Sequence, residues 1–257
     1  MKKTFWGGRR YCSLDYMLKE RYSEKLYKLS LNGGMTCPNR DGKISEGGCI
    51  FCSAGGSGDF AANFNPDIAK QIEQAKTLVS KKYQGDRFIA YFQAYTNTYA
   101  PVEYLRKLFM DTIMRDDIAI LSIATRPDCL GDDVIKLLAE LNRMKPVWVE
   151  LGLQTINEST AKLINRGYEL SCYDEAVRKL KNIGVEIITH MIIGLPYETK
   201  EDILSTAEYI GKTANGIKLQ LMHILKNTKL LEMYEKGEFK ALTEEEYIEI
   251  VCEIISI

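Results

Sequence analysis

The stretch from Met35 to Cys52 constrains the fold and the chemistry of this chain more than any other part of the sequence. It places Cys37, Cys49 and Cys52 within sixteen residues, with eleven residues in the first gap and two in the second. A proline and three glycines between these cysteines allow the backbone to wrap closely around a bound group. We therefore interpret this stretch as a loop that binds a metal or an iron–sulfur cluster.

The cysteines alone leave four interpretations open. A structural zinc site needs four protein ligands. The candidates for the fourth ligand are remote in sequence: Cys129, Cys172, Cys252, His190 and His223. A disulfide is disfavoured because the chain has seven cysteines and no secretion signal. Chance burial of three thiols does not explain the glycines, whereas a [4Fe–4S] cluster with three cysteine ligands leaves one iron open to a cofactor or substrate.

Four motifs carry a family resemblance. The spacing Cys-x11-Cys-x2-Cys, with Phe51 before the last cysteine, resembles the cluster loop of radical S-adenosylmethionine (radical SAM) enzymes, and its long first gap is similar to the branch that includes the Elongator catalytic subunit. Within that branch the chain resembles the bacterial YhcC/YtqA-type family along nearly its whole length. The motifs are Cys37-Pro-Asn-Arg-Asp-Gly, Gly47-Gly-Cys-x-Phe-Cys, Phe92-Gln-Ala-Tyr-Thr-Asn-Thr-Tyr-Ala-Pro101 and Glu150-Leu-Gly-Leu-Gln-Thr155.

This resemblance implies a cofactor, a reaction and a substrate. Cys37, Cys49 and Cys52 are expected to hold a [4Fe–4S] cluster whose open iron binds the amino and carboxylate groups of S-adenosylmethionine. Reduction by a reductase, flavodoxin or ferredoxin then yields a 5′-deoxyadenosyl radical that abstracts hydrogen from the substrate. The family points to a tRNA wobble uridine, whose carboxymethylaminomethyl group is shortened to aminomethyl before a separate methylation.

Two other functions remain open at this point. One is a radical SAM enzyme that acts on a small metabolite or a protein, and the other is a non-enzymatic, zinc-bearing RNA-binding protein. A basic and aromatic N-terminal segment suits RNA, although a solvated charged tail has the same composition. Its residues are Lys2, Lys3, Trp6, Arg9, Arg10 and Tyr11.

Composition indicates an ordinary soluble globular protein, with 46% hydrophobic residues and a net charge of −1. No signal peptide and no run of roughly 18 apolar residues is present, so we expect a cytoplasmic protein without membrane contact. We expect one radical SAM domain over 1–257 with an N-terminal extension over 1–30. Residues 243–257 stop in a helical pattern without a cap while family relatives continue, which indicates a C-terminus that is truncated.

Helical and strand patterns alternate along most of the chain, which predicts an α/β fold with parallel strands and right-handed crossovers. Strands are expected at 26–31, 87–95, 118–125, 147–154, 185–193 and 216–223. Helices are expected at 14–23, 66–83 with Pro66 in the first turn, 101–115, 132–144, 158–165, 173–182 and 201–212, followed by helical patterns to the end. Six units are fewer than the eight of a closed barrel, so we predict a partial (β/α)6 barrel of the radical SAM type.

Polar residues at every second position indicate which strand faces line the barrel interior. In the strand at 147–154 the odd positions are aliphatic, whereas the even positions are Trp148, Glu150, Gly152 and Gln154. Buried carboxylate and amide groups need partners. Since active sites lie at the carboxyl ends of barrel strands, we expect Glu150 and Gln154 to contact the cofactor, the alternative being a structural hydrogen bond.

The strand at 87–95 shows a second polar face, with Gln93 and Tyr95 at its carboxyl end as further cofactor contacts. Here the family's usual Gly-Gly-Glu sequence is replaced by Gln93-Ala-Tyr-Thr-Asn97, so the individual contacts differ. The glycine-rich stretch at 53–59 is either a flexible linker or a backbone that approaches the cofactor.

Three more residues are candidates for the site. His190 shares an apolar strand face and is either catalytic or a satisfied core histidine. Arg166 is positioned to clamp a carboxylate, or else is solvated. Gly194, in Gly-Leu-Pro-Tyr-Glu-Thr, resembles the family's loop beside the adenine ring, and Phe51 belongs to the cluster loop. On the last strand one face carries Lys218, Gln220 and Met222.

Overall fold

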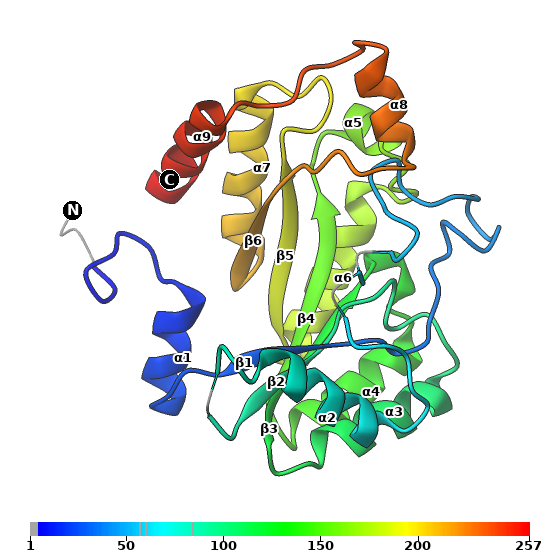
Figure 1. Cartoon of the computed structure of the whole chain (residues 1–257), viewed down its shortest axis with the longest axis vertical. Helices are drawn as coiled ribbons and strands as arrows, with labels where there is room; N and C mark the ends of the chain where they lie inside the picture. The colour runs from blue at the N-terminus through cyan, green and yellow to red at the C-terminus, as the bar shows by residue number, and fades with distance from the viewer. Residues whose placement is uncertain (1–4, 57, 60, 84) are drawn as a thin grey trace.

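Six parallel strands form one sheet in the order β1-β2-β3-β4-β5-β6. The computed structural model describes residues 5–56, 58–59, 61–83 and 85–257. The strands are β1 (Tyr27–Leu31), β2 (Phe88–Phe92), β3 (Ile118–Thr125), β4 (Val147–Gln154), β5 (Glu186–Ile193) and β6 (Gly216–Leu221). The sheet curls from β1 to β6 into an open half-barrel (Figure 1). The predicted partial (β/α)6 barrel is confirmed.

Helices connect successive strands and cover the outer face of the sheet (Figure 1). They are α1 (Leu14–Tyr22), α2 (Ile68–Val79), α3 (Val102–Ile113), the short 3₁₀ helix η1 (Pro127–Cys129), α4 (Asp132–Asn142), α5 (Glu158–Leu163), α6 (Leu170–Asn182), α7 (Lys200–Thr213), α8 (Lys229–Glu235) and α9 (Glu244–Ser256). In Figure 1, α9 lies beside α7 and contacts it. No helix in the described ranges is both long and apolar enough to cross a bilayer.

Several predicted boundaries were wrong for local reasons. Pro66 precedes α2, because the Asp67 side chain accepts the N–H groups of Ala69 and Lys70 and caps the helix there. β2 ends at Phe92, three residues before the predicted end, and Tyr95 beyond it has a φ of +60°, in the left-handed region rather than the extended one.

Two other boundaries also moved. α6 begins at Leu170 rather than Tyr173, because the Leu170 N–H donates to the carboxylate of Glu158 and orders the first turn. β6 ends at Leu221, two residues before the predicted end at His223. These shifts leave the number and order of the strands unchanged.

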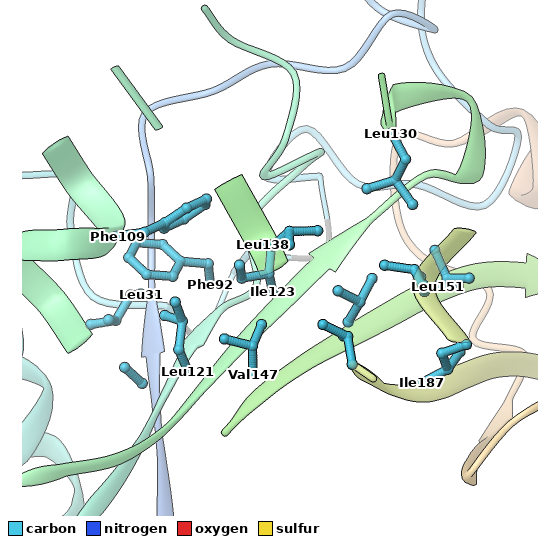
Figure 2. Close-up of a cluster of buried hydrophobic side chains, with 14 of the residues drawn as sticks. Leu31, Phe92, Phe109, Leu121, Ile123, Leu130, Leu138, Val147, Leu151 and Ile187 are labelled. Atoms are coloured by element: carbon cyan, nitrogen blue, oxygen red, sulfur yellow. The ribbon is translucent and has the colours of Figure 1, made fainter. Parts of the chain in front are cut away.

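The outer face of the sheet carries the main hydrophobic core. The odd residues of β4, from Val147 to Leu153, are fully buried against the helices, as their spacing predicted. Figure 2 shows part of this core, where Phe92 of β2 and Phe109 of α3 meet edge to face with ring centroids 5.2 Å apart. Burying one such side chain contributes about 1.5–3 kcal/mol. Because many of these side chains pack between the sheet and the helices, this core holds the sheet in its curved shape.

An apolar floor closes the amino end of the barrel interior. Ile89, Ile120 and Trp148 point inward from three strands and pack against Leu18 of α1 and Leu26. All five side chains are buried. The interior therefore opens toward the carboxyl ends of the strands, which is where parallel barrels place their sites.

The described part of the N-terminal segment places its basic and aromatic residues together. Trp6 and Arg9 form an isolated bridge, and the Arg9 guanidinium lies 5.9 Å from the Tyr11 ring centroid. Lys2 and Lys3, which the sequence also assigned to this segment, lie outside the described residues.

We expect Phe109→Ala to lower the free energy of unfolding by about 3–5 kcal/mol, because it removes a buried ring and leaves a cavity between α3 and β2. Urea unfolding followed by circular dichroism measures this loss. Leu78→Ala on α2, where the side chain is largely exposed, is the control and should change stability by less than about 0.5 kcal/mol. Equal effects of the two substitutions would contradict the assigned core.

Candidate functional site

Cys37, Cys49 and Cys52 line one cavity at the carboxyl end of the sheet. Their loop follows β1, as predicted, and it is joined to α8 by a hydrogen bond from the Leu230 N–H to the Ile50 carbonyl. In Figure 1 this blue loop runs near α8. All three cysteines are partly buried free thiols. The structure therefore brings the three predicted ligands to a single cavity without a disulfide.

Asn39 ties the cysteine loop to the segment that follows α5. Its side-chain amide donates to the Asn165 carbonyl at 2.6 Å and lies 3.5 Å from the Cys49 sulfur. The backbone carbonyl of Asn39 accepts a further hydrogen bond, from the Gly48 N–H at 2.7 Å. Asn39 is fully buried, so these bonds hold Cys49 in a fixed position.

Gly48 allows a guanidinium to pack under the loop. Its φ is +86°, and a Cβ there would lie 2.9 Å from the Arg40 side chain. Arg40 in turn donates to the carbonyls of Cys52 and Ser53 and lies 5.8 Å from the Tyr95 ring centroid. The Cys52 end of the loop is thus held by a cation rather than by regular secondary structure.

The donor set fits a cluster better than a zinc ion. No three His, Cys, Asp or Glu side chains among the described residues converge closely enough to hold a single metal ion. Tetrahedral zinc requires four such ligands around one point. A [4Fe–4S] cluster is bound through irons at separate corners, so three cysteines spaced around one cavity suit it.

The protonation state of Cys49 agrees with a need for a bound cation. A hydrogen bond with Cys52, together with burial, raises the pKa of Cys49 well above its ordinary value. The Cys49 thiolate, the form that ligates iron, is therefore disfavoured unless a metal supplies positive charge.

A layer of charged residues crosses the barrel interior between the floor and the cysteines. Both oxygens of Glu150 accept hydrogen bonds: one accepts from Lys28 and from the Ser122 hydroxyl at 2.6 Å, and the other lies 2.7 Å from His190 Nε2. These partners come from β1, β3 and β5. We call Lys28, Tyr91, Ser122, Glu150, His190 and Lys218 the polar layer.

The electrostatics of the polar layer favour an ionised glutamate and a neutral histidine. Burial alone would raise the pKa of Glu150, but the hydrogen bond from His190 and the charge of Lys28 outweigh it and lower the pKa. Burial lowers the pKa of His190 despite its bond to Glu150. Since protein donors already occupy both oxygens of Glu150, the structure favours the structural role for this carboxylate, while His190 lies in the cavity lining.

The amide and aromatic candidates lie above this layer. Phe51, Gln93, Tyr95 and Gln154 all line the cavity, as predicted. Gln154 has a φ of +71° at an irregularity in the β4–β5 pairing, and its buried Oε1 has no hydrogen-bond partner in the described structure. An orphaned buried acceptor is costly unless a ligand donates to it, so Gln154 is the best-supported cofactor contact of this group.

Tyr95 fastens the glycine-rich stretch to the cavity. Its hydroxyl donates to the Ala54 carbonyl at 2.8 Å, and its N–H donates to the Gly56 carbonyl at 2.9 Å. Gly56 lines the cavity, and a Cβ on it would lie 2.2 Å from the Tyr95 ring. These contacts favour a backbone that approaches the cofactor over a flexible linker.

Arg166 and Gly194 differ from the other candidates. Arg166 follows α5 rather than a strand, is almost fully buried, and donates to the carbonyls of Tyr168, Leu153 and Thr155 and to the Glu158 carboxylate. These bonds make it a residue that positions the loop around the cysteines. Gly194 is absent from the cavity lining, and its nearest neighbour is the Leu242 side chain.

Sequence reasoning missed several residues that the structure places at the site. Lys28 and Ser122 lie on β1 and β3, and the sequences of these strands did not by themselves indicate that these residues face the site. Arg126, just after β3, is held by Asp128 and donates to the Arg166 carbonyl at 2.9 Å. The signal for Arg126 was its position directly after a buried strand, where barrel sites gather.

Comparison with known proteins gives consistent matches. Residues 37–210 match the Radical SAM superfamily, and residues 214–257 match the Radical_SAM C-terminal domain. The chain is 47% identical to YtqA of Bacillus subtilis over 97% of its own length and 78% of that protein. It is 38% identical to YhcC of Escherichia coli over 93% of its own length and 76% of that protein. A tRNA uridine(34) acetyltransferase of Methanocaldococcus infernus is 30% identical over 51% of this chain and 25% of that protein.

Solved structures show the same fold. Elp3 of Methanocaldococcus infernus, lacking its N-terminus, superposes with a TM-score of 0.65 at 20% identity and covers 89% of this chain. The radical SAM enzyme coproporphyrinogen III oxidase (HemN) of Escherichia coli gives a TM-score of 0.58 at 17% identity and covers 95%. The chain spans 53% and 55% of those two chains, respectively.

Asn39→Ala should lower the iron bound per protein after anaerobic reconstitution, because it frees Cys49 and the carbonyl of Asn165 from their shared donor. It should also lower the stability of the metal-free protein by about 1–3 kcal/mol. Iron analysis and urea unfolding measure the two effects. Asn182→Ala, at an exposed position at the end of α6, is the matched control, and full iron loading of Asn39→Ala would refute the role of Asn39.

Glu198, in the loop after β5, should make the protein less stable as the pH rises. Burial raises its pKa to about 7 in the folded state, against an ordinary value of 4.5. The unfolded chain therefore loses this proton first, so stability decreases between about pH 4.5 and pH 7. We expect Glu198→Gln to gain on the order of 2 kcal/mol relative to the wild type on going from pH 5 to pH 8. Urea unfolding at both pH values measures it, with the exposed Glu235→Gln as control.

Proposed function

The chain belongs to the radical SAM superfamily, and on this premise we propose that it shortens the carboxymethylaminomethyl group of a tRNA wobble uridine to aminomethyl. Enzymes of this superfamily use a [4Fe–4S] cluster and S-adenosylmethionine. Held by Cys37, Cys49 and Cys52 and reduced, the cluster would supply the electron that cleaves S-adenosylmethionine to the 5′-deoxyadenosyl radical, which would remove a hydrogen atom from the CH₂ of the substrate arm. The arm would then give one electron back to the electron-transfer partner and take up water, so that its two outer carbons leave as glyoxylate and the aminomethyl group remains. The protein supplies the position of each partner and the exclusion of water.

Cys37, Cys49 and Cys52 would hold the cluster. The thiols line one cavity, and Asn39 and Arg40 fix the loop that carries them. With three protein ligands, a coordination site remains for the amino acid end of S-adenosylmethionine, as the superfamily's chemistry requires.

The amide and aromatic residues above the polar layer would bind the rest of S-adenosylmethionine. The free Oε1 of Gln154 can accept a hydrogen bond from a cofactor N–H or O–H group. Gln93 and Tyr95 line the same cavity, where the family's Gly-Gly-Glu sequence is missing. The apolar floor beneath the polar layer closes the amino end of the interior and so limits water access from that side.

The substrate assignment is supported by relatives. The similarity to a tRNA uridine(34) acetyltransferase is the observation that carries it, because that protein is named for its action on uridine 34, the wobble position. The shared fold with Elp3 agrees with this similarity. Arg9, Arg10, Trp6 and Tyr11 provide basic and aromatic groups suited to phosphates and bases. The proposal includes a reductase, flavodoxin or ferredoxin as electron donor and a cytoplasmic location.

Deletion of the gene should leave carboxymethylaminomethyluridine at the wobble position and remove the aminomethyl products. Mass spectrometry of nucleosides from purified tRNA measures both. The wild-type gene should restore the products and Cys49→Ala should not, because the cluster would lose a ligand. Cys252→Ala on α9, an exposed thiol far from the cluster loop in sequence, is the matched control and should restore them fully.

Unchanged wobble uridines in the deletion strain would exclude the tRNA assignment and leave a small metabolite or a protein as the substrate. Radical chemistry is tested separately by release of 5′-deoxyadenosine from the reduced, reconstituted protein. The wild type and Cys252→Ala should release it, whereas Cys49→Ala should not.

A further inference from the structure

Lys218 is a cation in the polar layer without a counterion of its own. It lies at the middle of β6, directly beside His190 of β5, and it lines the cavity. Its ammonium lies 3.4 Å from the Tyr91 hydroxyl and 5.3 Å from the Tyr91 ring centroid. Among the described residues no carboxylate lies within ion-pair distance of it, in contrast to Lys28 on the other edge strand.

Among the described residues that line the cavity, Glu150 is the one acid, and it cannot serve Lys218. Its two oxygens already accept hydrogen bonds from Lys28, Ser122 and His190. Lys28 also approaches the Tyr91 ring, with its ammonium 4.3 Å from the centroid. Two ammonium groups therefore lie near one aromatic ring, and only Lys28 is paired with the carboxylate, which leaves this level of the interior with an excess of positive charge.

This excess has an energetic consequence. Burial lowers the pKa of Lys218, the Lys28 charge lowers it further, and the charge of Glu150 only partly opposes them. A half-buried ammonium without a paired anion loses part of its hydration without compensation. An anionic ligand at this point would remove the cost and form charge-assisted hydrogen bonds.

The depth of Lys218 separates it from the cysteines. Met222, just after the end of β6, donates its N–H to the Ile193 carbonyl and belongs to the same apolar cluster as Ile50, which is adjacent to Cys49. At a rise of about 3.3 Å per residue and a strand tilt of about 35–45°, the Lys218 level lies roughly 10 Å below the Met222 level along the barrel axis. The amino acid end of S-adenosylmethionine, which belongs beside the cysteines, is therefore at a different level from Lys218.

We propose that Lys218, with the Gln220 amide, forms a subsite for a carboxylate of the substrate. Gln220 lies two residues after Lys218 on the same face of β6 and lines the cavity. The identity of the ligand rests on the proposed function, since the carboxymethylaminomethyl arm ends in a carboxylate and the aminomethyl product lacks one. The subsite would thus distinguish substrate from product.

The first test compares two anticodon stem-loop RNAs, one with carboxymethylaminomethyluridine and one with aminomethyluridine, in anaerobic equilibrium binding to the reconstituted full chain. The wild type should bind the carboxylate RNA about 10- to 100-fold more tightly, as charge-assisted hydrogen bonds imply. Lys218→Met should remove this preference, Lys218→Arg should keep part of it, and the exposed Lys236→Met on the end of α8 should keep all of it.

The second test needs no RNA. Lysines of the full chain are labelled with acetic anhydride, and labelling of Lys218 is quantified by mass spectrometry relative to that of the exposed Lys236 in the same sample, because the amine of the added probe also consumes the reagent. N-methylglycine, a mimic of the substrate arm, should protect Lys218 several-fold, whereas the neutral N-methylglycine amide should not. Thermal melting and 5′-deoxyadenosine release without substrate establish that Lys218→Met folds and still binds the cofactors.

The outcomes separate the two proposals. Protection by N-methylglycine without a preference between the RNAs would keep the carboxylate subsite and overturn the tRNA assignment. Absence of protection in the wild type would overturn the subsite. A Lys218→Met variant that loses cofactor cleavage or affinity for both RNAs equally would also overturn it, because Lys218 would then hold S-adenosylmethionine or the fold.

Discussion

The buried carboxylate of Glu150 is the interaction on which the interior of this barrel depends. It is almost inaccessible to solvent and receives donors from three other strands, so it links β1, β3, β4 and β5 through one charge. Removing a single donor would leave a buried charge undercompensated. A slip of one residue in any strand would turn its donor to the outer face. The polar layer therefore requires a defined register, and this register also sets the positions of the residues above it.

The spacing of β4 predicted this arrangement in part. Alternation of aliphatic and polar residues identified the inner face of β4 and, with it, Glu150 and Gln154, because side chains of a strand alternate strictly between faces. The partners of Glu150 could not be predicted in the same way. Lys28 and Ser122 are brought to it by the order of the strands and the stagger of the sheet, which depend on the whole fold.

The sequence predicted less well the roles of residues whose neighbours in the structure belong to loops. Arg166 looked like a free cation in sequence, yet the turns after β4 and α5 leave backbone carbonyls without partners, and its guanidinium satisfies them. Gly194 has a φ of +90°, as expected for a glycine in a tight turn, but its neighbour is Leu242 from the segment before α9. The cysteines were predictable because their spacing is local, whereas these contacts join segments far apart in the chain.

The interior is divided into levels with different chemistry. An apolar floor lies below the polar layer, amide and aromatic groups lie above it, and the cysteines are at the open end. A group that enters from the open end meets the cofactor level first, where Arg40, Arg126 and Arg166 are held by protein acceptors, and it reaches Lys218 at its far tip. Such a cavity selects for a narrow arm that ends in an anion, because a neutral arm would leave Lys218 unpaired and a bulky one would be stopped by the floor side chains. Under the two proposals, the radical would be generated at the level of the cysteines and the substrate recognised at the deeper level of Lys218.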